Sequence, residues 1–170
     1  WYTLSLHDAL PIFDVAAAEI LAARPDRFES KYRLSLGENA GLVQDAVRQT
    51  IAMLAGAPRS RPWGGYIAVG ADGRVVGTCA FKTGPDQDGA IEIAYFTFPP
   101  FEGHGVATAM ARQLLEMARA SQEVREVIAH TLPERNASTR VLEKIGMQCV
   151  GEVIDPDDGR VWRWRFRLRP

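Results

Sequence analysis

Two glycines mark the point where a strand-like segment gives way to a helix-like one, within residues 91–115. Apolar residues alternate before a Pro-Pro pair and then recur at helical spacing from Val106 onward. Because Gly103 and Gly105 carry no Cβ, the backbone can turn sharply there and approach a ligand, beside helical N–H groups that lack intrahelical partners. This arrangement predicts a phosphate-binding helix start, with an ordinary turn as the alternative. The spacing matches neither a dinucleotide-binding fingerprint nor a P-loop.

The composition is that of one globular domain. The 170 residues suffice for a single well-packed domain, and 46% of them are hydrophobic and 24% charged. The apolar runs are far shorter than a membrane span, so no membrane segment is expected. The net charge of -1 argues against nucleic acid as a partner.

Cys79 and Cys149 both lie in strand-like segments, without another Cys or His at metal-ligand spacing. We expect both to be buried, reduced thiols, with a disulfide between them as the alternative. Together with the lack of an export signal, this favours a cytoplasmic protein. The first twelve residues, WYTLSLHDALPI, are interpreted as a non-native addition, so that residues 13–170 form the single domain. A genuine first strand or helix is the alternative.

The order of predicted elements indicates an α+β fold. Period-2 and period-3.6 patterns, separated by turn signals such as Asp72-Gly73, give the order ααβββαβαββ. A helix between two strands favours local parallel pairing, whereas hairpins pair antiparallel, so the central sheet should be mixed, mostly antiparallel and flanked by helices. Helices are expected at 14–23, 39–55, 106–120 and 136–145, and strands at 66–69, 75–81, 91–98, 126–131, 148–154 and 161–168.

With these segments in place, the chain resembles the GNAT superfamily of acetyl-coenzyme A-dependent N-acyltransferases from about residue 39 to the end. Residues 91–110 resemble the strand, pyrophosphate loop and helix of that family, 127–131 its next strand, and 136–147, NASTRVLEKIGM, its next helix. The combination is most similar to the branch that contains the acetylases RimJ and RimL and many small-molecule acetylases. The resemblance implies acetyl transfer from acetyl-CoA to an amine, and no metal.

The resemblance also assigns the contacts to acetyl-CoA. Backbone N–H groups of the loop should hold the pyrophosphate, the end of the central strand should pair with the pantetheine amides, and Asn136 should bond the pantetheine arm or cap its helix. Glu102 departs from the family pattern of Arg or Gln, and we expect it to point away because a carboxylate repels phosphate. The implied cofactor-binding residues are Phe96, Thr97, Phe98, Gly103, His104, Gly105, Val106, Ala107, Thr108 and Asn136.

Three residues are candidates for the chemistry that the resemblance implies. Glu92 and His130 match positions of a general base in family members, and an imidazole suits that role near neutral pH. Of the two, Glu92 is expected nearer the pantetheine and is the first choice. The tyrosine acid of some members has no counterpart, because Leu142 stands at its position. Ser138, which matches a serine that protonates the leaving thiolate in other members, is the remaining candidate. Each candidate also has a purely structural alternative. Glu92 would then be a solvated or paired carboxylate on the sheet face, His130 a surface or capping histidine, and Ser138 a hydroxyl bonded within its own helix turn.

The last strand alternates aromatic residues with arginines, which predicts one core face and one solvated arginine face, or a surface for an acidic partner such as RNA. Taken together, the resemblance and the cysteine content lead us to expect a cytoplasmic N-acetyltransferase, monomeric or homodimeric. Its partners would be acetyl-CoA and an amine of a small molecule or protein N-terminus. A non-catalytic acyl-CoA sensor or interaction module with the same fold is the alternative.

Overall fold

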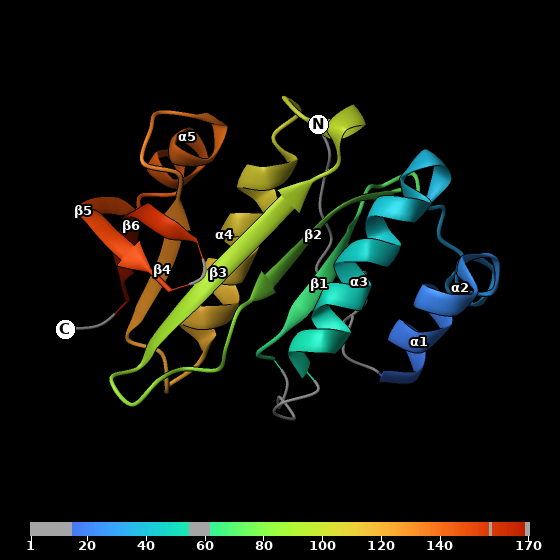
Figure 1. Ribbon diagram of the computed structural model, residues 1–170, viewed down its shortest axis with the longest axis horizontal. Coiled ribbons are helices and arrows are strands. Elements are labelled where there is room, and N and C mark those ends of the chain that lie inside the picture. The colour runs from blue at the N-terminus through green and yellow to red at the C-terminus, as the bar shows by residue number, and fades with distance from the viewer. Residues whose placement is uncertain (1–14, 55–61, 157, 169–170) are drawn as a thin grey trace.

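The computed structural model describes residues 15–54, 62–156 and 158–168 (Figure 1). The expectation that residues 1–12 are non-native lies outside these ranges. The helices are α1 (Val15–Ala23), α2 (Pro25–Tyr32), α3 (Ala40–Leu54), α4 (Val106–Ala120) and α5 (Ala137–Lys144), with the short 3-10 helices η2 (Gly37–Asn39) and η3 (Pro99–Phe101). The strands are β1 (Gly65–Val69), β2 (Val75–Phe81), β3 (Ala90–Thr97), β4 (Glu126–Thr131), β5 (Gln148–Asp155) and β6 (Gly159–Arg167).

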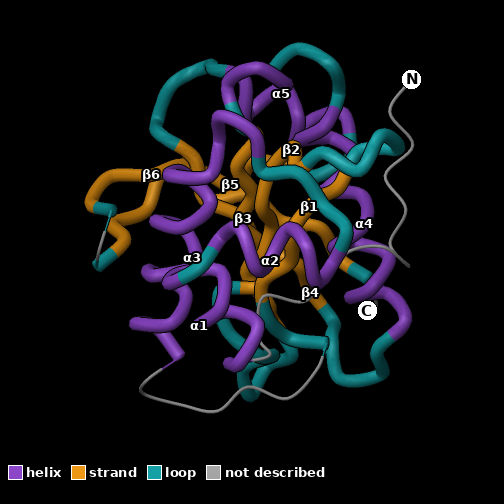
Figure 2. The backbone as a smooth tube through the Cα atoms, turned by 90° about the vertical axis from the view of Figure 1, so that its right-hand side faces the viewer, coloured by secondary structure: helices purple, strands orange, loops and turns teal. Residues whose placement is uncertain are grey.

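Six strands form one sheet in the order β1-β2-β3-β4-β6-β5. Only β3 and β4 pair in parallel, and every other pair in the sheet is antiparallel, which confirms the mixed, mostly antiparallel sheet. The parallel pair arises because α4 lies between β3 and β4 in the chain and crosses one face of the sheet. Figure 2 shows the sheet between α4 on one side and α1 and α3 on the other.

The core lies on both sides of β2 and β3. The helical spacing of α4 places Val106, Met110 and Leu114 on one face, and all three are buried. Gly77 on β2 permits close approach, because a Cβ there would lie 2.5 Å from the carbonyl oxygen of Phe96 and 3.1 Å from the Met110 side chain. The glycine therefore helps to fix β3 and the first turns of α4, the two elements that frame the site.

The alternation in β6 has the predicted consequence for the core face. Trp164 is 3% exposed, and its indole N–H donates to the hydroxyl of Thr131 on β4 at 3.0 Å. On the other face, the guanidinium groups of Arg163, Arg165 and Arg167 surround Glu126 at 3.7–3.9 Å. The contacts with Glu126 are those of a partly solvated charged face.

The sequence analysis missed α2. Pro25 ends the preceding helical pattern, but it also fills the first turn of α2, where the missing proline N–H leaves no hydrogen bond unmade. The helix has only eight residues and a mostly polar sequence, so its periodicity is weak. It is held by tertiary packing, because Phe28 is 2% exposed and α2 lies against α1. Within the helix, the Phe28 ring lies 4.7 Å from that of Tyr32.

The prediction that both cysteines are buried is wrong for Cys149. Cys79 on β2 is buried, and burial raises the pKa of its thiol to about 12, whereas Cys149 is exposed. The reason is that β5 is an edge strand whose residues are mostly exposed on both faces. Both thiols are free, so they form no disulfide with each other.

One thiol per native chain should therefore react rapidly with a maleimide. The reactive residue should be Cys149, because Cys79 is shielded and its raised pKa keeps it protonated. Mass spectrometry of the labelled protein measures the stoichiometry, and denaturation should release the second thiol. Cys149→Ser should remove the fast reaction. Two labels on the native chain would contradict the burial of Cys79.

Candidate active site

The site opens where β3 and β4 separate (Figure 1). Their parallel pairing ends at Glu92 and Ile128, although both strands continue beyond these residues. The edge of β3 that faces the gap is therefore open to pairing with an extended ligand. Two spaces border the gap, and Tyr95 and Ser138 line both of them. We call them the α4–α5 cleft and the charged pocket.

The α4–α5 cleft has a volume of about 570 Å³ and lies at the start of α4. Gly103 and Gly105 adopt φ values of 75° and 81°, which only glycine adopts readily. Gly105 caps α4, and its carbonyl oxygen accepts the Ala109 N–H at 3.0 Å. The N–H groups that come before Ala109 in the first turn of α4 therefore have no partner within the helix, and they lie at the positive end of its dipole.

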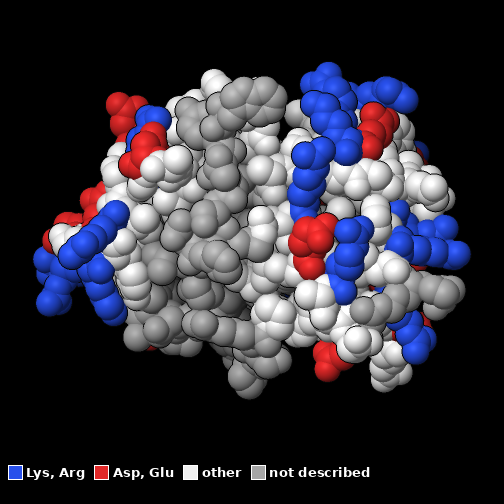
Figure 3. Space-filling view, turned by 180° about the vertical axis from the view of Figure 1, so that it is seen from behind, with Lys and Arg blue, Asp and Glu red and all other residues white. Residues whose placement is uncertain are grey.

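Two basic residues of α5 line the opposite wall of the α4–α5 cleft. Arg140 and Lys144 are four residues apart, so they lie on the same face of the helix. Figure 3 shows Lys and Arg side chains gathered at the end of the molecule where α5 lies. Glu102 also lines the cleft, whereas we expected it to turn away. The sequence analysis missed both basic residues, although their spacing of four was visible in it.

Most of the predicted cofactor residues line this cleft. Three do not: Phe98 is fully buried in the core, and neither His104 nor Asn136 contributes to the lining. Asn136 caps α5, where its side-chain oxygen accepts the N–H of Thr139 at 3.0 Å. The residues that do line the cleft are Phe96, Thr97, Gly103, Gly105, Val106, Ala107 and Thr108.

The charged pocket has a volume of about 320 Å³ and contains both predicted base candidates. Nδ1 of His130 lies 3.1 Å from Oε1 of Glu92, and Nζ of Lys82 lies 2.7 Å from the same oxygen. Glu92 and His130 are 15% and 11% exposed. Because a carboxylate only accepts, the contact places the proton of neutral His130 on Nδ1. Nε2 is then the basic nitrogen, and it is buried without a hydrogen-bond partner among the described residues.

Further carboxylates flank this pair. Oδ2 of Asp155 lies 3.8 Å from His130 Nδ1, and Oδ2 of Asp158 lies 3.8 Å from Lys82 Nζ. Burial alone lowers the pKa of Lys82, but its hydrogen bond and attraction to Glu92, together with the two aspartates, outweigh burial and raise that pKa. Lys82 is therefore a fixed cation beside Glu92.

Tyr95 lies at the junction of the two spaces, and the sequence analysis missed it. Burial raises the pKa of its phenol to about 12, and the hydroxyl donates to the backbone oxygen of Ser138 at 3.4 Å. Alternation along β3 places Tyr95 on the sheet face opposite Glu92. Leu142, which stands where other family members have a tyrosine acid, is fully buried in α5.

The described residues contain no helix that is long and apolar enough to cross a membrane, and no cluster of three or more His, Cys, Asp or Glu that could hold a metal ion.

Comparison with known proteins places this geometry in context. The family model described as acetyltransferase (GNAT) domain matches residues 4–148. No curated protein sequence matches the chain significantly. Solved structures share its fold at low sequence identity. A GNAT-family acetyltransferase from Bacillus anthracis has a TM-score of 0.62 at 17% identity over 99% of both chains. Aminoglycoside acetyltransferase AAC(6')-Ib, in complex with coenzyme A, has a TM-score of 0.61 at 20% identity over 98% of this chain and 95% of that one. RimL, an acetyltransferase of ribosomal L7/L12 in complex with coenzyme A, has a TM-score of 0.59 at 13% identity over 94% and 91%.

Proposed function

Because the chain belongs to the GNAT acetyltransferase family, we propose that it transfers the acetyl group of acetyl-CoA directly to a primary amine of a small molecule or a protein N-terminus. The observation that carries this proposal is the meeting of the α4–α5 cleft and the charged pocket at Tyr95 and Ser138. One space has the groups to hold an anionic acetyl donor. The other has a bare imidazole nitrogen that can accept a proton from an amine.

In this proposal the α4–α5 cleft holds acetyl-CoA. The unpaired N–H groups at the start of α4 bind the pyrophosphate, and Arg140 and Lys144 offset the charge of Glu102. The open edge of β3 beyond Glu92 pairs with the pantetheine amides, as an added strand would. This path brings the thioester to Tyr95 and Ser138, the residues shared with the charged pocket.

His130 acts as the base in the proposed reaction, and Glu92 positions it. Oε1 of Glu92 is already occupied by the Lys82 ammonium and by His130 Nδ1. Nε2 of His130 has no competing hydrogen bond among the described residues. This assignment reverses the order of preference that the sequence alone suggested.

Tyr95 supplies the other proton. The amine nitrogen attacks the thioester carbon and gives its proton to His130 Nε2, and the C–S bond breaks as the leaving sulfur takes the proton of the Tyr95 hydroxyl. The Tyr95 phenol is protonated at neutral pH, as a proton donor must be, although burial raises its pKa to about 12 and so makes it a weaker acid. Exchange with water then returns the proton from His130 to Tyr95. Ser138 is the competing donor because it lines both spaces.

Acetyl-CoA should stabilise the fold. Ligand at 100 times its dissociation constant adds about 2.7 kcal/mol, which corresponds to a rise of roughly 5–10 °C in melting temperature for a chain of this size. Gly105→Glu should abolish the rise, because it places a carboxylate at the proposed phosphate site. Gly105→Ala controls for the strain at φ 81°, and Gly41→Glu on α3 controls for an added charge. An unchanged rise in Gly105→Glu would refute the loop assignment.

His130→Ala should lower kcat by about 10²- to 10⁴-fold with little effect on acetyl-CoA affinity, and should remove the acidic limb of the rate-pH profile. Glu92→Gln should lower kcat less and keep that limb, because a positioning residue does not itself accept the proton. Free-thiol release from acetyl-CoA with an amine panel measures both. The limb disappearing in Glu92→Gln instead would make Glu92 the base. If acetyl-CoA binds normally but none of the amines causes thiol release, the non-catalytic sensor would be favoured.

Tyr95→Phe should lower kcat by about 10²-fold or more, because it removes the proton donor while retaining the buried ring. Ser138→Ala leaves the backbone oxygen that accepts the Tyr95 hydroxyl, so its rate should stay within about threefold of the parent. The assay is the same thiol release at saturating acetyl-CoA. The opposite ranking of the two variants would assign the acid to Ser138.

A further inference from the structure

We propose that the acceptor is a small di- or polycationic amine, which presents a second positive charge to the charged pocket besides the amine that is acetylated. This inference rests on the proposed function for its place in a reaction, but it makes a separate claim about binding. It follows from the charge balance of the pocket, from a buried polar atom in its wall and from its size.

The charge balance is negative. Glu92 and Asp158 line the pocket, and Asp155 adds a third carboxylate 3.8 Å from His130. Lys82 is the single lysine or arginine among the lining residues of this described pocket, so carboxylates exceed ammonium and guanidinium groups by one in the lining and by two when Asp155 is counted. Because Glu92 and Asp155 are 15% and 14% exposed, solvent screens their charges only partly.

The described arginines of β6 pair with carboxylates outside the pocket lining. Arg163 lies opposite His130 on β6, and its guanidinium is 3.9 Å from Glu126, a carboxylate outside the pocket lining. Arg160 lies beside Ile154 at this end of β6, but its guanidinium pairs with Glu152 at 2.7 Å. Arg165 and Arg167 lie farther along the strand, beside Ile128 and Glu126. The negative excess therefore lies around Asp158, which lines the pocket, with Asp155 nearby on β5.

Lys82 shows which chemistry the carboxylates accept. Its side chain ends in a primary alkylammonium, which lies 2.7 Å from Glu92 and 3.8 Å from Asp158. A ligand ammonium is the same chemical group and can occupy the free side of Asp158, which is 60% exposed. Nε2 of His130, buried and without a partner among the described residues, is the second observation that points to a ligand, because it can accept a hydrogen bond from the amine to be acetylated.

The size of the pocket suits a small acceptor. A volume of about 320 Å³ corresponds to roughly ten water molecules at about 30 Å³ each, which suits a short aliphatic chain. An acceptor with a carboxylate at the end away from its amine would meet Asp158 with like charge. The pocket therefore discriminates among small amines by the charge at their far end.

Three ligands of one length test this claim: 1,4-diaminobutane, butylamine and 4-aminobutanoate, each titrated by calorimetry into the folded protein saturated with coenzyme A. We expect the diamine to bind at least tenfold more tightly than butylamine, and 4-aminobutanoate to bind most weakly. The preference for the diamine should shrink at high salt, because it depends on charge. Equal affinities for the three ligands, or the tightest binding for 4-aminobutanoate, would overturn the proposal.

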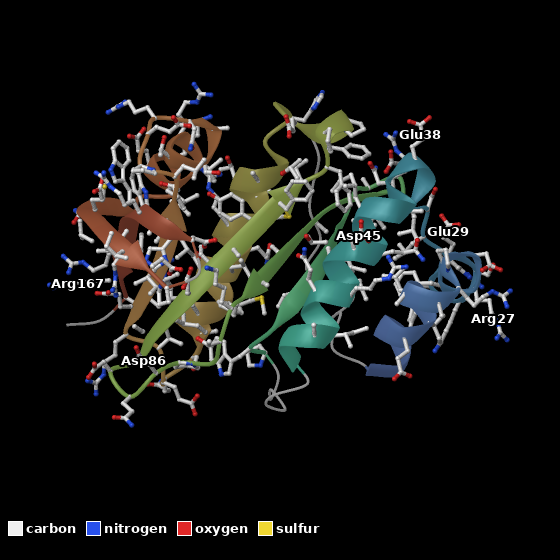
Figure 4. The ribbon with its side chains drawn as sticks, in the orientation of Figure 1. Arg27, Glu29, Glu38, Asp45, Asp86 and Arg167 are labelled. Carbon is white, nitrogen blue, oxygen red and sulfur yellow. The ribbon has the colours of Figure 1, made fainter. Side chains whose placement is uncertain are left out.

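Asp158→Asn should reduce the preference for the diamine over butylamine by severalfold or more, and Asp158→Glu should retain most of it. Asp45→Asn is the matched control, because Asp45 lies on α3, away from the charged pocket, and its exposed side chain pairs with Arg48 (Figure 4). An undiminished preference in Asp158→Asn would overturn the assignment to this end of the pocket.

Turnover of the same ligands separates this inference from the proposed function. Acetylation of butylamine and 1,4-diaminobutane with equal kcat/KM, together with equal affinities, would leave the acetyltransferase in place and refute the polycation site. Preferential binding of the diamine without acetylation of any amine would support the site and refute the proposed function.

Discussion

The end of the pairing between β3 and β4 is the constraint on which the site depends. Up to Glu92 and Ile128 the two backbones satisfy each other, and beyond them the polar groups on the facing edge of β3 need another partner. A ligand with amide groups can supply that partner, so binding completes a hydrogen-bond pattern that the sheet leaves open. The same separation allows Tyr95 to reach both the α4–α5 cleft and the charged pocket. If β3 and β4 stayed paired to the end of β4, the α4–α5 cleft and the charged pocket would not share a wall.

The charged pocket depends on three adjacent strands. Lys82 follows β2, Glu92 lies on β3 and His130 on β4, and the backbone N–H of Lys82 donates to the Glu92 carbonyl at 2.8 Å, which fixes their register. A carboxylate as buried as Glu92 costs free energy unless it is paired, and Lys82 provides that pairing. The pairing also changes what Glu92 can do, because an engaged carboxylate orients an imidazole better than it removes a proton. The choice between Glu92 and His130 thus depends on a third residue.

Local patterns in the sequence predicted most of the fold. All six strands lie within two residues of their predicted bounds, and the glycine-bearing turn leads into α4 as expected. The misses share one cause: α2, the exposure of Cys149 and the roles of Lys82 and Tyr95 all depend on contacts between distant segments. Periodicity placed Tyr95 on a face of its strand, but only the separation of β3 from β4 puts that face at a cleft. Likewise, Arg140 and Lys144 were visible as a helix face, but their position opposite the start of α4 was not.

The two spaces differ in charge in a way that suits the proposed reaction. The α4–α5 cleft combines the positive end of a helix with Arg140 and Lys144, whereas the charged pocket has an excess of carboxylates. An anionic donor and a cationic acceptor would therefore enter from opposite sides and meet at Tyr95 and Ser138. The chemistry at that junction requires neutral groups, because the amine attacks only after losing its proton. Tyr95, whose pKa burial raises to about 12, is neutral there as well. The carboxylates would thus hold the ammonium at the far end of the acceptor, and the bare nitrogen of His130 would take the proton that the neutral amine gives up as it attacks.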